Sequence, residues 1–247
     1  MAWPFPPVAT LFVLVIFTGI VVVVISKALD HLWARVLSAG RVYYGITIPG
    51  IVIHECAHML GCFITGARVK KIVFFSRDGG SVTHGPPALP LLGNIIISTA
   101  PLFFIPLVLA GLIWLFCTYA GCSLSFSIFP IESAGTAISL VTGSVFILWE
   151  NLVVRFNAWF LLYLYLVLSL ILSLAPSMQD MKNAAAGLMI LTGAGLLVIW
   201  SNMGMVVPLF STLLQFIATG LALGLVFEIL AVLVSLPALV AFSLKEG

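Results

Sequence analysis

Six long apolar runs, nearly free of charged side chains, dominate this sequence; they cover residues 8–25, 42–65, 91–117, 159–174, 184–200 and 213–242. A helix needs about 20 mostly apolar residues to cross the hydrocarbon core of a bilayer. Only 7% of the 247 residues are charged, whereas about 25% are charged in a typical soluble domain. The pattern therefore predicts an all-α polytopic membrane protein with about six transmembrane helices, in contact with the lipid bilayer.

The segments between these runs are too short for a large soluble domain, so we expect one membrane-embedded domain over residues 1–247. The first run follows no basic segment and precedes no clear small-residue cleavage site, which favours a retained helix over a cleaved signal peptide. A net charge of +2 is too small to indicate a nucleic-acid partner. Any chemistry is therefore expected within or beside the membrane.

The second run contains His54-Glu55-Cys56-Ala57-His58, an H-E-x-x-H motif. Residues four apart on a helix lie on nearly the same face, so both imidazoles can bind one metal ion. Glu55 projects beside them, where a carboxylate can accept a proton from water, its role in zinc proteases. The alternative is two histidines satisfied by helix neighbours, with an incidental glutamate. Because ionisable groups are costly inside a membrane and usually mark function, we favour the metal site.

Two histidines do not complete a zinc site, which normally has three protein ligands and one position for water. Asp180 is the preferred third ligand, because it follows a helix-breaking proline at the start of an apolar run, where a carboxylate needs a partner. Glu132 and Glu150 stay open as alternatives. His31 lies in a polar connection, and His84 would fill the position that a catalytic zinc keeps for water, so neither is expected to be a ligand.

A β-hairpin is predicted directly after the motif helix. Thr65-Gly66 is a typical helix end, with glycine where a left-handed residue is often needed. β-branched and aromatic residues then flank an Asp78-Gly79-Gly80 turn, which indicates two short antiparallel strands. Such a ribbon beside the metal site could bind an extended peptide by strand addition. It could equally be a connection that only covers the helix end.

The third run is interrupted in its first half by Asn94, Ser98, Thr99 and Pro101. Irregular backbone at membrane depth is tolerated only where protein or a water-filled cavity satisfies it, so this segment is expected to line the site. Asn94 could donate a hydrogen bond to a developing oxyanion. An asparagine in such a place more often ties two helices together, which remains the alternative.

The four cysteines, Cys56, Cys62, Cys117 and Cys122, do not form a disulfide framework. Cys117 and Cys122 could pair in an oxidising compartment or remain reduced. Glu228 stands alone in the last apolar run, as either a buried polar partner or part of a path to the site.

Taken together, the motif, the Thr65-Gly66-Ala67-Arg68-Val69 segment, the Gly79-Gly80-Ser81-Val82 turn and Asp180 resemble the site-2 protease family of intramembrane zinc metalloproteases. The resemblance covers about residues 48–110, with a second patch around residues 174–184, and Ala100-Pro101 looks like the family's Gly-Pro element. Three features depart from the family pattern: Gln179-Asp180-Met181 replaces Leu-Asp-Gly, Phe104 replaces a frequent asparagine, and no PDZ-like domain is inserted. The chain resembles a divergent member, with a protease-like core at about residues 42–200.

The resemblance implies one zinc ion held by His54, His58 and Asp180, with Glu55 as the base. It implies hydrolysis of peptide bonds in membrane-spanning proteins or peptides, within or near the bilayer. Two other functions stay open. One is a non-catalytic binding or regulatory membrane protein that retains the metal site, and the other is a different membrane zinc hydrolase with Glu132 as third ligand.

The orientation follows from seven basic residues: Arg68, Lys70, Lys71 and Arg77 follow the motif run, and Lys27, Arg35 and Arg41 lie on the opposite side. By the positive-inside rule, this excess of four to three places the hairpin and the active site toward the cytoplasm. The sequence carries no indication of an oligomeric state.

Overall fold

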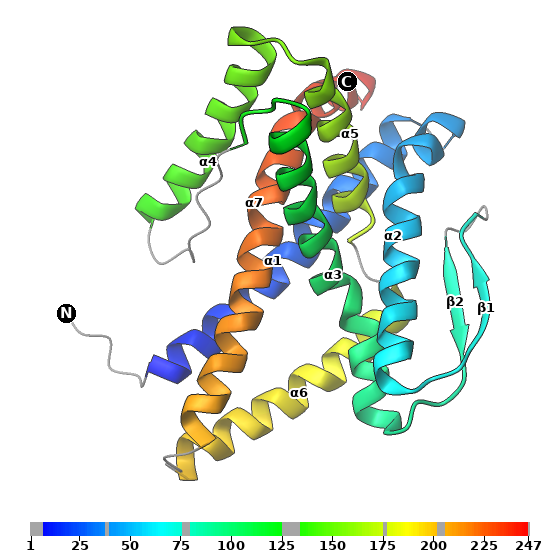
Figure 1. Cartoon of the computed structure of the whole chain (residues 1–247), viewed down its shortest axis with the longest axis vertical. Coiled ribbons are helices and arrows are strands. Elements are labelled where there is room, and N and C mark those ends of the chain that lie inside the picture. The colour runs from blue at the N-terminus through cyan, green and yellow to red at the C-terminus, as the bar shows by residue number, and fades with distance from the viewer. Residues whose placement is uncertain are drawn as a thin grey trace.

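A computed structural model of the chain describes residues 7–37, 40–75, 80–124, 134–174, 177–201 and 206–246. The helices are α1 (Pro7–Val36), α2 (Arg41–Thr65), α3 (Pro90–Tyr119), α4 (Ala134–Trp149), α5 (Ala158–Leu172), α6 (Met178–Ser201) and α7 (Val206–Glu246). A π-helical segment, η1 (Glu150–Val154), continues α4. Two strands, β1 (Val69–Val73) and β2 (Ser81–His84), form an antiparallel ribbon that lies beside α2 (Figure 1).

Four of the described helices, α1, α2, α3 and α7, are long and apolar enough to cross a membrane. Their candidate spans are Leu11–Val36, Arg41–Thr65, Pro90–Tyr119 and Phe210–Val240. The segments Val141–Val154 and Ala158–Leu172 are apolar but shorter. These helices support a polytopic helical membrane protein with four candidate spans, and the total of about six stays a prediction.

The first helix is longer than the sequence pattern indicates. The apolar run ends near residue 25, and the polar residues after it were expected to form a connection, but α1 continues without a break to Val36. Val22, Leu29 and Trp33 continue one stripe at helical spacing and pack into the core. The charged residues between them occupy the other faces of the same helix, so this stretch is part of the bundle.

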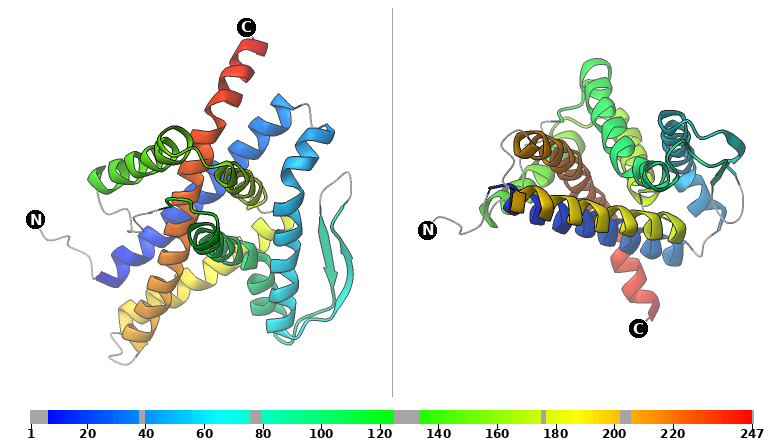
Figure 2. Two further views of the ribbon diagram at one scale, coloured as in Figure 1. Left: turned by 45° about the horizontal axis from the view of Figure 1, so that its top comes forward. Right: turned by 90° about the horizontal axis from the view of Figure 1, so that it is seen from below.

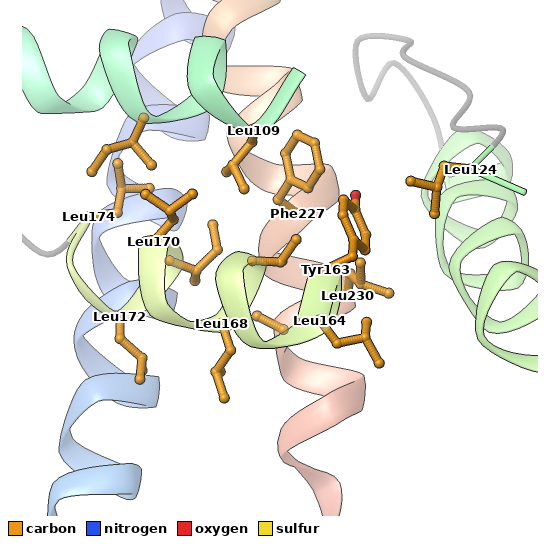
Figure 3. Packing of buried hydrophobic residues seen from close by; sticks show 14 of the residues in the cluster. Leu109, Leu124, Tyr163, Leu164, Leu168, Leu170, Leu172, Leu174, Phe227 and Leu230 are labelled. Atoms are coloured by element: carbon orange, nitrogen blue, oxygen red, sulfur yellow. The ribbon is translucent and has the colours of Figure 1, made fainter. Parts of the chain in front are cut away.

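The core lies where α5 and α7 meet α1 and α3 (Figure 3). Leu109, Phe160, Phe227 and Leu230 are fully buried there. Figures 1 and 2 show α6 slanting across the bundle; it packs on α3, and Asp180 in its first turn reaches His58 of α2. The beginning of α6 is thereby brought close to the middle of the motif helix.

The predicted hairpin is confirmed. Val69 pairs with His84 and Val73 with Ser81, and a bulge interrupts the register between Val69 and Lys71. Gly66 ends α2 as predicted, with φ at 70° and its N–H donating to the carbonyl of Phe63. The Asp78-Gly79 part of the predicted turn lies outside the described residues.

Candidate metal centre

A proline and a glycine in α2 draw α5 against the motif helix. Because Pro49 has no N–H, the carbonyl of Gly45, four residues earlier, loses its helical donor. The hydroxyl of Tyr165 on α5 donates to that carbonyl at 2.7 Å. The N–H of Gly50 donates to the Ser169 hydroxyl at 2.9 Å, and a Cβ on Gly50 would lie 2.0 Å from the Ser169 carbonyl oxygen. Only glycine allows α5 to lie this close to α2.

The end of α5 then meets the first histidine of the motif. Carbonyls in the last turn of a helix have no donor within the helix. Ser173 follows the last residue of α5, and its carbonyl accepts a hydrogen bond from Nδ1–H of His54 at 2.5 Å. The close packing at Gly50 therefore places an unused backbone oxygen against His54.

A second proline and a second glycine position the second histidine, which bonds directly to the carbonyl that the proline leaves without a donor. Pro101 in α3 has no N–H, so the carbonyl of Ile97, four residues earlier, also lacks its helical donor. That carbonyl accepts a hydrogen bond from Nδ1–H of His58 at 2.8 Å. A Cβ on Gly61 would lie 2.9 Å from the Cα of Ile97, so glycine is again what allows the approach.

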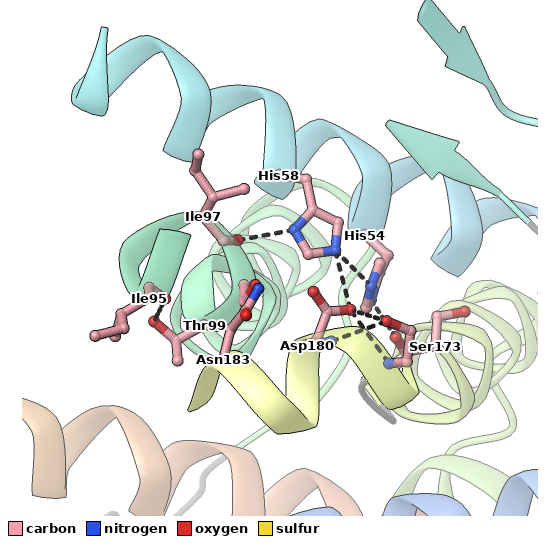
Figure 4. Close-up of polar contacts among 10 residues, drawn as sticks. His54, His58, Ile95, Ile97, Thr99, Ser173, Asp180 and Asn183 are labelled. Atoms are coloured by element: carbon pink, nitrogen blue, oxygen red, sulfur yellow. Dashed lines mark hydrogen bonds and ion pairs between the residues drawn. The ribbon is translucent and has the colours of Figure 1, made fainter. Parts of the chain in front are cut away.

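These two hydrogen bonds fix the tautomer of each imidazole in its neutral form. A carbonyl only accepts, so Nδ1 carries the hydrogen in each neutral ring and Nε2 presents a lone pair. The two Nε2 atoms face each other at 3.0 Å, in residues that are 9% and 8% exposed (Figure 4). Two lone pairs at this distance repel each other unless a metal ion or a proton lies between them. A histidine that binds a metal through one ring nitrogen usually donates a hydrogen bond from the other, as Nδ1 does here.

Asp180 completes the cluster from the first turn of α6. Its Oδ2 lies 3.6 Å from Nε2 of His58, and its side chain is 13% exposed. Ser177 and Asp180 form a capping box: the Ser177 N–H and hydroxyl donate to Oδ2 at 3.2 and 2.5 Å, and the Asp180 N–H donates back to the hydroxyl at 3.1 Å. This box orients the carboxylate toward the histidines.

The donor set fits a metal ion. The three ligand atoms of His54, His58 and Asp180 all lie within 4.8 Å of one another. In a tetrahedral zinc site with ligand distances of about 2.0 to 2.1 Å, neighbouring ligand atoms are about 3.3 to 3.4 Å apart. The separations of 3.0 and 3.6 Å found here bracket that value. The sequence prediction that these residues come together is thus met, in a cluster that could hold a metal ion.

Glu55 lies beside this cluster, under the ribbon. The residue is 5% exposed, and its Oε2 has no hydrogen-bond partner among the described residues. A Cβ on Gly80, just before β2, would lie 2.6 Å from Oε1 of Glu55. The glycine at this point of the turn therefore lets the ribbon pass directly over the carboxylate.

A cavity of about 590 Å³ contains His54, Glu55, His58 and Asp180. Residues of β2 form part of its wall. The amide of Asn183, one turn after Asp180, donates to the Ser98 hydroxyl at 2.8 Å, and both side chains line the cavity. The structure does not bring Asn94, the sequence candidate for an oxyanion donor, into this lining.

The other candidate ligands lie elsewhere. Glu150 pairs with Arg155 at 3.1 Å on η1, outside the cluster. Glu132 lies outside the described residues. His84 lines the cavity, but its Nδ1 donates to the carbonyl of the next residue and it is not part of the cluster. His31 is exposed on α1.

Cys117 and Cys122 are both free thiols, the first exposed and the second buried. Burial raises the pKa of the Cys122 thiol, with a smaller contribution from Cys117. Glu228 is fully buried in α7, away from the cavity lining, and neither of its carboxylate oxygens has a hydrogen-bond partner among the described residues. Among the described residues, Glu228 is thus neither paired with a polar group nor part of the cavity wall.

The sequence prediction missed the two carbonyl oxygens and Asn183. Pro101 was a usable signal, because a proline inside a helix always leaves the carbonyl four residues earlier without its helical donor. Asn183 follows Asp180 by three residues and therefore shares its face of α6. The Ser173 carbonyl had no comparable signal, since it depends on contact between helices more than 100 residues apart.

No protein-family model matches the chain, and neither curated proteins nor solved structures give a match.

Proposed function

We propose that this protein is an intramembrane zinc metalloprotease that hydrolyses peptide bonds of membrane-spanning substrates within or near the bilayer. The main support is the pair of Nε2 lone pairs, each fixed by a hydrogen bond from Nδ1 to a backbone carbonyl, with the Asp180 carboxylate beside them. Two imidazoles and one carboxylate are the ligand set of many zinc hydrolases. The two histidines lie in a candidate membrane span, α2, and this supports a function within the membrane.

His54, His58 and Asp180 would hold the ion, and a bound zinc supplies a Lewis acid that polarises a carbonyl and lowers the pKa of water. Glu55 acts as the base. Its carboxylate takes one proton from the attacking water as the water oxygen adds to the carbonyl carbon of the substrate. It then delivers that proton to the departing amine nitrogen as the C–N bond breaks, and the second proton of the water stays on the new carboxyl group, so the products are a carboxylic acid and an amine.

The cavity supports this assignment in a second way. Hydrolysis needs water and an extended peptide at a site that the bilayer would otherwise keep dry. Ser98, Asn183 and β2 give the cavity a partly polar wall, which can hydrogen-bond to water and to the backbone of a peptide. A bound peptide could also pair with the ribbon, because an exposed strand edge offers unpaired N–H and carbonyl groups.

Replacing Glu55 by Gln tests the proposal. We expect the purified full chain in vesicles to contain one zinc per molecule and to cut members of a library of fluorescent membrane-spanning peptides. Glu55→Gln should keep the zinc, because its side chain is not a ligand, and should lower the cleavage rate by at least about 100-fold. Cys56→Ala, at the next position of the same helix, serves as the control. Cleavage at the wild-type rate by Glu55→Gln would refute the mechanism.

The same preparations separate the two other functions. A regulatory protein with a retained metal site would bind zinc and cut no peptide in the library. A hydrolase with Glu132 as third ligand would lose zinc on Glu132→Ala and keep it on Asp180→Ala. Our proposal requires the reverse order.

A further inference from the structure

The cavity extends along α2, away from the metal cluster, to a second polar group at the corner between α1 and α2. Asp30, Tyr43 and Thr47 line this end. Tyr43, Thr47 and His54 share one face of α2, because steps of four and seven residues return to nearly the same direction on a helix. The two polar ends therefore belong to one continuous space.

Asp30 has a hydrogen bond but no salt bridge among the described residues, and its ionisable neighbour on α1, His31, is exposed. The Tyr43 hydroxyl donates to its Oδ1, and no ion pair to Asp30 occurs within the part of the chain that the structure describes. Lys27, one turn earlier on α1, donates to the sulfur of Met181 at 2.6 Å instead. A partly buried carboxylate near a membrane is costly without a cationic partner. The cavity gives such a partner access from outside the chain.

We propose that the Asp30 carboxylate, which accepts a hydrogen bond from Tyr43, is a subsite for the ammonium or guanidinium group of a substrate lysine or arginine; this rests on the proposed proteolytic function. The subsite would also set the position of cleavage. Tyr43 and His54 are eleven residues apart on α2, or about 16 Å at 1.5 Å per residue. An extended peptide advances about 3.3 Å per residue. The cut bond should therefore lie about five residues from the basic side chain.

This spacing describes a class of substrate. Asp30 and Tyr43 lie near the ends of α1 and α2 that face each other, six residues before Val36 and two after Arg41. Such helix ends lie near the membrane surface, where the flanks of membrane-spanning segments carry their lysines and arginines. The substrates are membrane-spanning segments with a basic flank, cut about one and a half helical turns inside it.

A single lysine moved stepwise along an otherwise uncharged membrane-spanning peptide tests the subsite. Vesicles of phosphatidylglycerol alone avoid competition from lipid ammonium groups. Mass spectrometry should show the cleaved bond moving with the lysine, at a constant spacing of about five residues. Replacing that lysine by glutamine should lower kcat/KM about tenfold, as expected for loss of a partly buried ion pair. Both effects should disappear in Asp30→Asn. A cleavage site that ignores the lysine would overturn the proposal.

Binding to Glu55→Gln tests the same subsite without cleavage. The lysine peptide should bind more tightly than its glutamine counterpart, and Asp30→Asn in this background should remove the difference. Equal binding refutes the subsite even if the wild-type protein cuts both peptides. A lysine preference in binding, with no cleavage by the wild-type protein, supports the subsite and refutes the proteolytic function.

Tyr43→Phe distinguishes recognition from helix packing. It removes the hydroxyl and keeps the carboxylate, so the lysine preference should remain. If the pair only ties α1 to α2, Tyr43→Phe and Asp30→Asn would slow the cleavage of charged and uncharged peptides equally, and the proposal would be wrong.

Discussion

Asp180 performs two tasks at the scale of a single residue. Its Oδ2 accepts from Ser177 in the capping box of α6 and also faces Nε2 of His58. A carboxylate has enough lone pairs for both, since its two oxygens offer about four acceptor positions. An ordinary helix cap would place the Asp180 carboxylate in the same way. Substitutions are therefore needed to separate its role as a cap from its role as a metal ligand.

Asp180→Asn separates them. The amide oxygen can still accept from Ser177, so the free energy of unfolding should change by less than about 1 kcal/mol. The loss of the negative ligand should weaken zinc binding at least about tenfold, measured by competition with a chelator. Ser177→Ala is the matched control, because it removes the capping hydroxyl and keeps the carboxylate. Zinc binding by Asp180→Asn at the wild-type affinity would show that Asp180 is only a cap.

The sequence could predict His54, Glu55 and His58 because they are close along one helix. It could nominate Asp180 from its setting, yet only the fold brings that residue within 3.6 Å of His58. Asp30 and Tyr43 were not linked, since the charged end of α1 resembles a connection in the sequence. A contact between two helices leaves no periodic signal in the sequence of either helix. The contact between Asp30 and Tyr43 was missed for that reason.

At the scale of elements, two close contacts hold α2 against its neighbours. Gly50 admits α5 and Gly61 admits α3, and each neighbour supplies the carbonyl that a motif histidine uses. The ribbon was predictable from its β-branched strands and its turn. Its position over Glu55 was not, because it depends on the close approach of Gly80.

Gly61→Ala should therefore damage the metal centre from a distance. The added methyl would overlap the Cα of Ile97 at 2.9 Å, so α3 must move and the hydrogen bond from His58 must lengthen. Loss of such outer support typically weakens metal binding by about 10- to 100-fold. Gly45→Ala on the same helix is the control, because its Cβ would meet nothing within 4 Å. Equal zinc affinities in the two variants would contradict the role given to the close contact.

At the scale of the whole molecule, a bound metal would join segments far apart in the chain. His54 and His58 belong to α2 and Asp180 to α6, whereas α6 otherwise slants across the bundle with few buried side chains among its described residues (Figure 2). A ligand at 100 times its dissociation constant stabilises the folded state by about 3 kcal/mol. The metal should thus be a main attachment of the start of α6.

Removing the metal tests this attachment. A chelator should lower Tm by roughly 5 to 10 °C, from the stabilisation above and the usual scaling with chain length. Hydrogen exchange should rise most in the first turns of α6 and least in the core part of α7. The chelator should have no further effect on His58→Ala. A uniform rise in exchange across all helices would instead mean that the metal supports the whole bundle.

The two carbonyl acceptors imply an uneven tolerance of the chain to mutation. A main-chain oxygen is supplied by whichever amino acid stands at position 97 or 173, so any side chain that fits can replace Ile97 or Ser173 without removing the acceptor. The residues that cannot be substituted are instead Gly50, Gly61 and Pro101, which have no reactive groups but allow the helices to place these carbonyls. A saturation mutagenesis profile of activity should show these three positions to be as intolerant as the ligands themselves. The record of this chemistry in related sequences would therefore lie largely in glycines and a proline.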